Sequence, residues 1–156
     1  MFAAAFAPPA PRELTLLVGA GEDTLSVNAF LPSKVTVRVG DTVTWKLNHS
    51  DEKHTTTFLG GAERPPPAVH IPGGGPMDLM IPSKVGFPTR APGGPVETFS
   101  GTNFVSAGIM SNVPAGPPGT PPNNTFTVTF DTPGTFDSVV EQGKITSMKG
   151  LVDEKT

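Results

Sequence analysis

Three histidines and five methionines are the side chains of this sequence that could bind a metal ion through nitrogen or thioether sulfur. The histidines are His49, His54 and His70. Three imidazoles are an adequate donor set for copper or zinc, but the spacing of these three does not predict that they converge. His49 lies in a polar loop, and His70 lies between Val69 and Ile71, where a partly buried histidine is common. A three-histidine site therefore stays an open alternative.

The chain contains no cysteine. Disulfides, thiolate zinc sites, iron–sulfur clusters and catalytic thiols are therefore excluded, as is a type 1 copper centre, which depends on a cysteine thiolate. No other group of residues predicts catalysis. Ser100-Gly101 and Gly19-Ala20-Gly21 are typical of turns, and the carboxylates Asp131, Asp137 and Glu141 have no evident acid–base partner. We expect that the protein is not an enzyme.

The overall composition predicts a single globular domain. The chain has 156 residues, of which 36% are hydrophobic and 16% charged, enough for one core. A net charge of −3 gives no reason to expect nucleic acid or an anionic membrane as a partner. Met1 to Ala7 is apolar but too short to span a membrane. Its Ala5-Phe6-Ala7 is similar to the end of a signal peptide, and a flexible start is the alternative.

The stretch from Val35 to Leu59 gives the strongest structural signal. Valines at 35, 37, 39 and 43 alternate with polar residues, which is the period of a half-buried strand. Gly40-Asp41 between the two runs predicts a hairpin turn. Trp45 is the single tryptophan, and its bulk predicts a place at the centre of a two-sheet core. His54 opens the next strand, where we expect its side chain at the edge of the sandwich.

Further strands are predicted at 14–18, 25–29, 125–130, 135–140 and 148–152, with turns between them. From Gly60 to Pro122 the alternation breaks down and proline and glycine are frequent. Because this segment also carries several phenylalanines and methionines, we expect most of it to be ordered, against the sandwich or against a neighbouring subunit. The residues predicted to be largely buried on the inner faces are Phe30, Trp45, Phe130, Phe136 and Val140.

The run from Pro32 to Phe58 resembles the cupredoxins, the small blue-copper proteins related to plastocyanin. The matching pattern is P-x-x-V-T-V-x-V-G-D-T-V-T-W followed by H-T-x-T-F. The resemblance implies an all-β Greek-key sandwich or barrel and implies that His54 stands at the position of the first copper ligand. On this reading, residues 1–13 are an extended N-terminal segment and 14–152 one cupredoxin-like domain. Residues 60–122 are then an irregular Pro/Gly-rich insertion, and 153–156 a charged tail.

The C-terminal part matches the same family without a gap, except at the ligands. Phe130, Pro133, Gly134, Phe136, Gly150 and Val152 fall on the family's pattern. Met148 keeps the methionine position, but Val140 replaces the cysteine and Gly143 the second histidine. The resemblance thus implies that His54 and Met148 are vestigial ligand positions, and we expect no cofactor.

The function predicted on this basis is a non-catalytic, exported module that has lost its copper centre. It would act outside the cell, at the cell surface or in the periplasm as a structural, assembly or adhesion subunit. A protein partner or self-assembly is expected, without nucleic acid or a transmembrane segment. The alternative is a copper protein, for electron transfer or copper handling, that uses His54 in a rebuilt, cysteine-free site.

Overall fold

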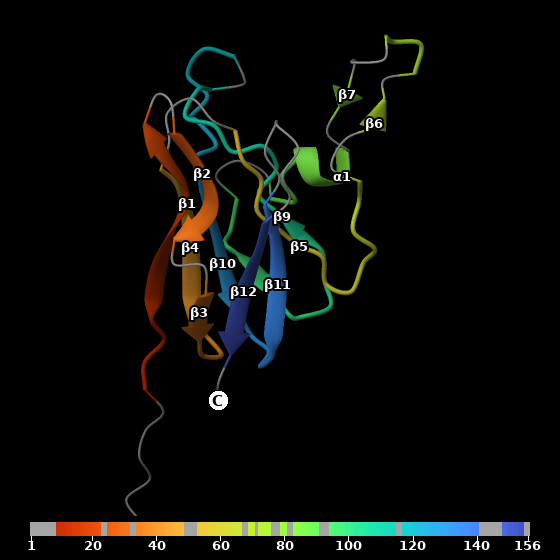
Figure 1. Cartoon of the computed structure of the whole chain (residues 1–156). Coiled ribbons are helices and arrows are strands. Elements are labelled where there is room, and N and C mark those ends of the chain that lie inside the picture. Colours follow the sequence, from red (N-terminus) through yellow and green to blue (C-terminus); the bar gives the residue numbers. More distant parts are fainter. Residues whose placement is uncertain are drawn as a thin grey trace, which may run out of the picture.

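The chain folds into two five-stranded β-sheets that pack face to face, with a short helix and a small projecting hairpin (Figure 1). The computed structural model describes residues 9–22, 25–31, 34–48, 53–66, 69–70, 72–75, 79–80, 83–90, 94–114, 117–140 and 148–154. Within these residues no helix has the length and apolar character needed to cross a membrane.

The first sheet, sheet A, has the strand order β2-β1-β4-β10-β8. Its strands are β1 (Glu13–Glu22), β2 (Leu25–Leu31), β4 (Thr42–Leu47), β8 (Glu97–Phe99) and β10 (Thr125–Phe130). The second, sheet B, has the order β3-β12-β11-β5-β9. Its strands are β3 (Lys34–Val37), β5 (Thr57–Phe58), β9 (Val105–Ser106), β11 (Thr135–Val140) and β12 (Met148–Glu154). The projecting hairpin pairs β6 (Val69–His70) with β7 (Leu79–Met80), and α1 spans Ser83–Gly86.

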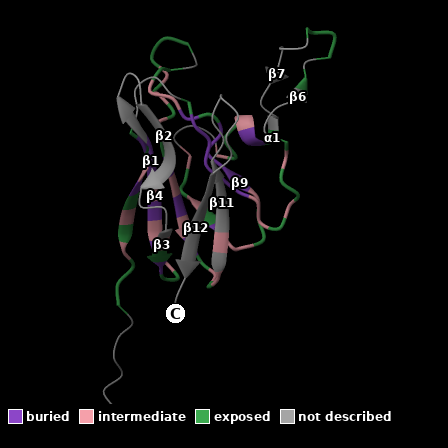
Figure 2. Ribbon diagram, in the orientation of Figure 1, coloured by how far each residue is buried: buried purple, intermediate pink, exposed green. Residues whose placement is uncertain are grey.

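The core lies between the sheets and is rich in aromatic rings. Along β4, buried residues alternate with partly or fully exposed ones (Figure 2). The buried residues are Val43, Trp45 and Leu47. Trp45 packs edge-on against Phe58, with ring centroids 5.3 Å apart. The predicted burial of Trp45 and Phe130 is confirmed, at 0% exposure each. Phe136 is only partly buried, and the side chains of Phe30 and Val140 fall outside the described residues.

The predicted hairpin at Gly40-Asp41 is wrong. β3 and β4 lie on either side of this turn but belong to different sheets, so the chain crosses from one layer of the sandwich to the other. Val37 of β3 and Val43 of β4 are both fully buried, because the two sheets face one common core. An apolar alternation shows that each strand has one face on a core, but it does not show whether two strands share a sheet.

The segment 60–122 contributes to both sheets. β8 extends sheet A beside β10, and β9 extends sheet B beside β5. Phe99, Val105 and Met110 are buried in the common core, which confirms for these side chains that the segment packs on the sandwich. Phe87, in contrast, is 70% exposed. That the segment is an insertion into a cupredoxin-like domain stays a prediction.

Candidate functional site

His54 is a core residue of the sandwich. It lies three residues before β5 and forms an isolated antiparallel bridge with Met110. The His54 amide donates to the Met110 carbonyl (3.2 Å), and the Met110 amide donates to the His54 carbonyl (2.7 Å). The His54 side chain has 0% exposure. The prediction of a side chain at the edge of the sandwich is therefore wrong, because Met110 brings an extra length of chain alongside it.

Gly19 makes room for the imidazole of His54. Gly19 interrupts the regular pairing of β1 with β2, where the register shifts between Val18 and Ala20, and its φ is +72°. A Cβ at Gly19 would lie 2.6 Å from His54 Nε2, closer than a side-chain carbon approaches a ring nitrogen in a packed core. The imidazole thus lies directly against the backbone of sheet A, in space that only a glycine leaves open.

Gly19→Ala is expected to lower the free energy of unfolding by about 2–3 kcal/mol, from the positive φ and from the clash with the ring. Urea denaturation measures this loss. In a His54→Ala background the clash is absent, so the same Gly19→Ala change should cost only about 1 kcal/mol for the backbone. Equal losses in the two backgrounds would contradict the contact.

Met110 is a neighbour of His54 that sequence reasoning missed. Its side chain is fully buried, and Thr56 Oγ1 donates a hydrogen bond to Met110 Sδ (3.6 Å). The surrounding chain is held by Asn123, whose side-chain amide donates to the carbonyls of Ala107 (2.9 Å) and Ile109 (2.8 Å). The methionines of the 60–122 segment led us to expect it to be ordered, but Met110 lies in a stretch without strand periodicity, so nothing in the sequence places it beside His54.

The backbone brings the other predicted ligand positions to the same end of sheet B. Val140 and Met148 are paired where β11 and β12 meet. Val139 is paired with Thr57 of β5, and His54 lies three residues before Thr57. Gly143 and the side chains of Val140 and Met148 fall outside the described residues. The register is therefore compatible with a common location, while the ligand assignment itself stays a prediction.

The donor set does not fit a type 1 copper ion. Such a centre uses two imidazoles and a thiolate, with a weak axial thioether. At the matching positions this chain has His54 and Met148, whereas Val140 and Gly143 carry no donor atom on their side chains. Cysteine is absent from the whole sequence.

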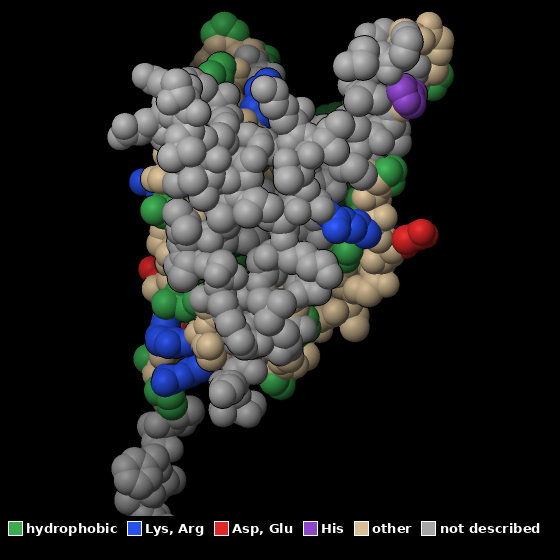
Figure 3. Space-filling model, in the orientation of Figure 1, with side chains coloured by type: hydrophobic (Ala, Val, Ile, Leu, Met, Phe, Trp, Pro, Cys, Tyr) green, Lys and Arg blue, Asp and Glu red, His purple; other side chains and the backbone are tan. Residues whose placement is uncertain are grey.

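A three-histidine site gains no support in the described part of the chain. No group of three or more His, Cys, Asp or Glu side chains there could hold a metal ion. His70 is exposed and lies on the projecting β6–β7 hairpin, where Figure 3 shows histidine at the surface. His54 is buried in the sandwich, and His49 falls outside the described residues.

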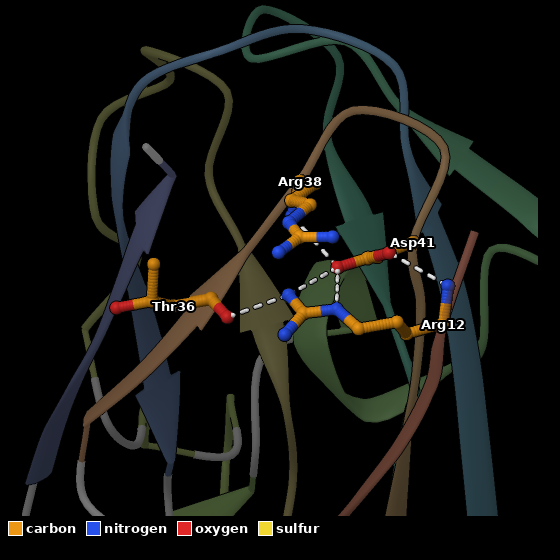
Figure 4. A network of polar contacts seen from close by, with 4 residues as sticks. All are labelled: Arg12, Thr36, Arg38 and Asp41. Carbon is orange, nitrogen blue, oxygen red and sulfur yellow. Dashed lines mark hydrogen bonds and ion pairs between the residues drawn. The ribbon is translucent and has the colours of Figure 1, made fainter. Parts of the chain in front are cut away.

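The strongest polar cluster surrounds Asp41, at the turn between β3 and β4 (Figure 4). Its carboxylate, which has no exposed surface, accepts hydrogen bonds from the Arg12 amide (2.7 Å) and from the Arg12 guanidinium (2.6 and 3.0 Å). The Arg38 amide donates a further bond (2.8 Å). Arg12 also donates to the carbonyl of Thr36 (3.1 Å). Asp41 therefore connects the start of β1 to the turn between the sheets.

The hydrogen bonds determine the charge state of Asp41. Burial by itself raises the pKa of a carboxyl group, but the bonds from Arg12 and Arg38 outweigh that effect, and the pKa of Asp41 lies below its ordinary value. Because its oxygens are already occupied by donors of the protein, Asp41 is a structural carboxylate rather than a general base. The sequence marks Asp41 only as a turn residue, and nothing in the pattern points to Arg12, 29 residues away.

Comparison with known protein families finds no match, and no curated protein matches the sequence. Among solved structures, a mutant of amicyanin in its reduced Cu(I) form at pH 4 is similar to the chain, with a TM-score of 0.41 and 17% sequence identity. The similarity covers 99% of this chain and 90% of that one. Membership of the cupredoxin family stays a prediction from the sequence.

Proposed function

We propose that this protein is a non-catalytic binding or structural module, built on a cupredoxin-like sandwich that has lost its copper centre. The observation that carries the proposal is the surroundings of His54. Its imidazole is fully buried and lies against Gly19, where it packs as a core side chain. Val140 and Gly143, which match the family's cysteine and second histidine in the sequence, supply no side-chain donor for a copper ion.

A structural role is further supported by how the most polar buried groups are used. The Asp41 carboxylate is held by Arg12 and Arg38, and Thr57 Oγ1 shares a hydrogen bond with Ser106 Oγ (3.0 Å). The Arg12–Asp41 and Thr57–Ser106 contacts join segments that are 29 and 49 residues apart in the sequence, and the Arg38–Asp41 bond closes the turn between β3 and β4. The apolar Met1–Ala7 stretch supports export, so the module would act outside the cell, at its surface or in the periplasm.

The alternative function is copper binding through His54 in a cysteine-free site. One observation favours it: the backbone places His54, Val140 and Met148 at one end of sheet B. A soft thioether and one imidazole make a weak donor pair, which competing cellular ligands would strip of copper. The alternative therefore requires a donor that the described residues do not supply.

Copper titration separates the two functions. We expect the purified full-length chain to show no intense absorption in the blue-copper region, because that band arises from a thiolate. After desalting, metal analysis should find less than about a tenth of an equivalent of copper.

Retention of one equivalent by the wild type and its loss in His54→Gln would overturn the proposal in favour of copper binding. Circular dichroism of the His54→Gln variant checks that the fold survives. His70→Gln is the matched control, because His70 is exposed on the β6–β7 hairpin.

A further inference from the structure

The outer face of sheet A is an ordered array of threonines. The strand registers align three rows across β1, β4, β10 and β8. Ten side chains alternate with the buried ones: Glu13, Thr42, Thr129 and Thr98 in the first row, Thr15, Thr44 and Thr127 in the second, and Leu17, Lys46 and Thr125 in the third. Seven of these ten are threonine, and all ten are partly or fully exposed.

Four of the seven threonine hydroxyls are already paired within the face. Thr42 Oγ1 and Thr129 Oγ1 lie 3.0 Å apart and share a hydrogen bond, and so do Thr44 Oγ1 and Thr127 Oγ1. Covering a hydroxyl is costly when it loses water and gains no partner. Here the central hydroxyls keep a partner when water leaves. These four hydroxyls therefore add little to the desolvation cost when another surface covers the face.

The two charges on this face are opposite in sign and stand at opposite ends. Lys46 is paired with Leu17 of β1, and Glu13 lies four residues earlier on the same strand. The two are thus about 5 Å apart across the strands and roughly 13 Å apart along them. Neither makes an ion pair within the described residues. The charges of the ten described side chains therefore cancel, with one positive end and one negative end.

We propose that this threonine face binds the same face of a second copy of the chain. A two-fold axis between Thr15 and Thr44, in the middle row, places Glu13 of each copy opposite Lys46 of the other, so that both charges are paired. The partner is a second copy because the two charges on one face are complementary to each other. Among the ten described side chains there is no aromatic ring on which a sugar could stack.

This proposal rests on the proposed function and names its partner. Ten side chains per copy are fewer than the 20–30 of a standard interface, so the dimer is weak and forms at micromolar or higher concentration. The pairing of Glu13 with Lys46 sets the orientation of the two copies more than it adds affinity.

Sedimentation equilibrium of the full chain over a concentration series tests the dimer. The wild type should dimerise, and Glu13→Lys and Lys46→Glu should each weaken dimerisation about tenfold, because each variant places like charges opposite one another. The double variant, Glu13→Lys with Lys46→Glu, should dimerise like the wild type. Glu63→Lys and Lys53→Glu are matched controls: both positions are exposed, lie outside the threonine face, and undergo the same changes of net charge.

Three outcomes would overturn the proposal. The first is a wild type that stays monomeric at every concentration. The second is a dimer that the single charge reversals leave unchanged, and the third is a double variant that fails to restore the dimer. These outcomes are separate from the copper titration, since a copper-free monomer contradicts the dimer alone and a stable copper complex contradicts the proposed function.

Discussion

Replacing Trp45 with alanine is expected to lower the free energy of unfolding by roughly 3–5 kcal/mol, through lost burial and the cavity that remains. Trp45 has no exposed surface. Its ring lies 5.3 Å from that of Phe58, 5.8 Å from Phe126 and 6.5 Å from Phe130, measured between centroids. These rings come from both sheets, so collapse into the cavity would require the layers to move together. The change should also weaken the contact between the two sheets.

Urea denaturation followed by far-ultraviolet circular dichroism measures this effect, because the variant has no tryptophan for fluorescence. Phe87→Ala is the matched control, since Phe87 is 70% exposed and should lose no more than about 0.5 kcal/mol. If the two variants unfold at the same urea concentration, Trp45 is not at the centre of the core.

Asp41→Asn is expected to cost roughly 3 kcal/mol at neutral pH, because it leaves the donors around a buried charge poorly matched. In the wild type, the Arg12 guanidinium and the Arg38 amide donate to a carboxylate. In the variant, the asparagine amide would turn its own N–H donors toward them. Chemical denaturation at pH 7 measures the loss. Asp131→Asn is the control, because Asp131 is exposed and its carboxylate accepts a hydrogen bond from the neighbouring Thr132 hydroxyl rather than from a cationic group.

The pH dependence of the Asp41 effect follows from the direction of its pKa shift. The pKa of Asp41 is lower in the folded chain than its ordinary value, so the unfolded state binds the proton more readily. The contribution of Asp41 is therefore complete above the unfolded pKa, about 3.9. It is lost as the pH falls through the folded pKa. The difference in stability between wild type and Asp41→Asn should be constant from pH 7 to about 5 and shrink below about 4. A difference independent of pH would contradict a charged, hydrogen-bonded Asp41.

The strands of the sandwich were largely predictable from the sequence, because their signal is local. Alternation at 125–130 and 135–140 matches β10 and β11, and the single tryptophan does lie at the centre of the core. Such patterns report which face of a strand is buried. Partners far apart in the chain leave no comparable signal, which is why Arg12 and Met110 were missed. The same limit explains the wrong hairpin at Gly40-Asp41.

The sequence named positions for a candidate site, but their role as former copper ligands stays a prediction. The resemblance to cupredoxins named His54, Val140 and Met148, and the strand registers bring their backbone positions to one end of sheet B. It did not predict the burial of the His54 imidazole, which depends on the bulge at Gly19 in the opposite sheet. Gly19 and His54 are 35 positions apart in the sequence. The imidazole fits because glycine has no side chain, and no pattern of residue types in the sequence indicates such a contact.

The position of β12 affects when the protein can fold during its synthesis. β12 (Met148–Glu154) lies between β3 and β11, so the interior of sheet B is completed by a strand that the ribosome makes after all the others described. Until then, β3 has no neighbour in its sheet and β11 is paired on one side only. The nascent chain thus exposes unpaired strand edges for most of its elongation. Sheet B therefore cannot be completed before β12 has been synthesised.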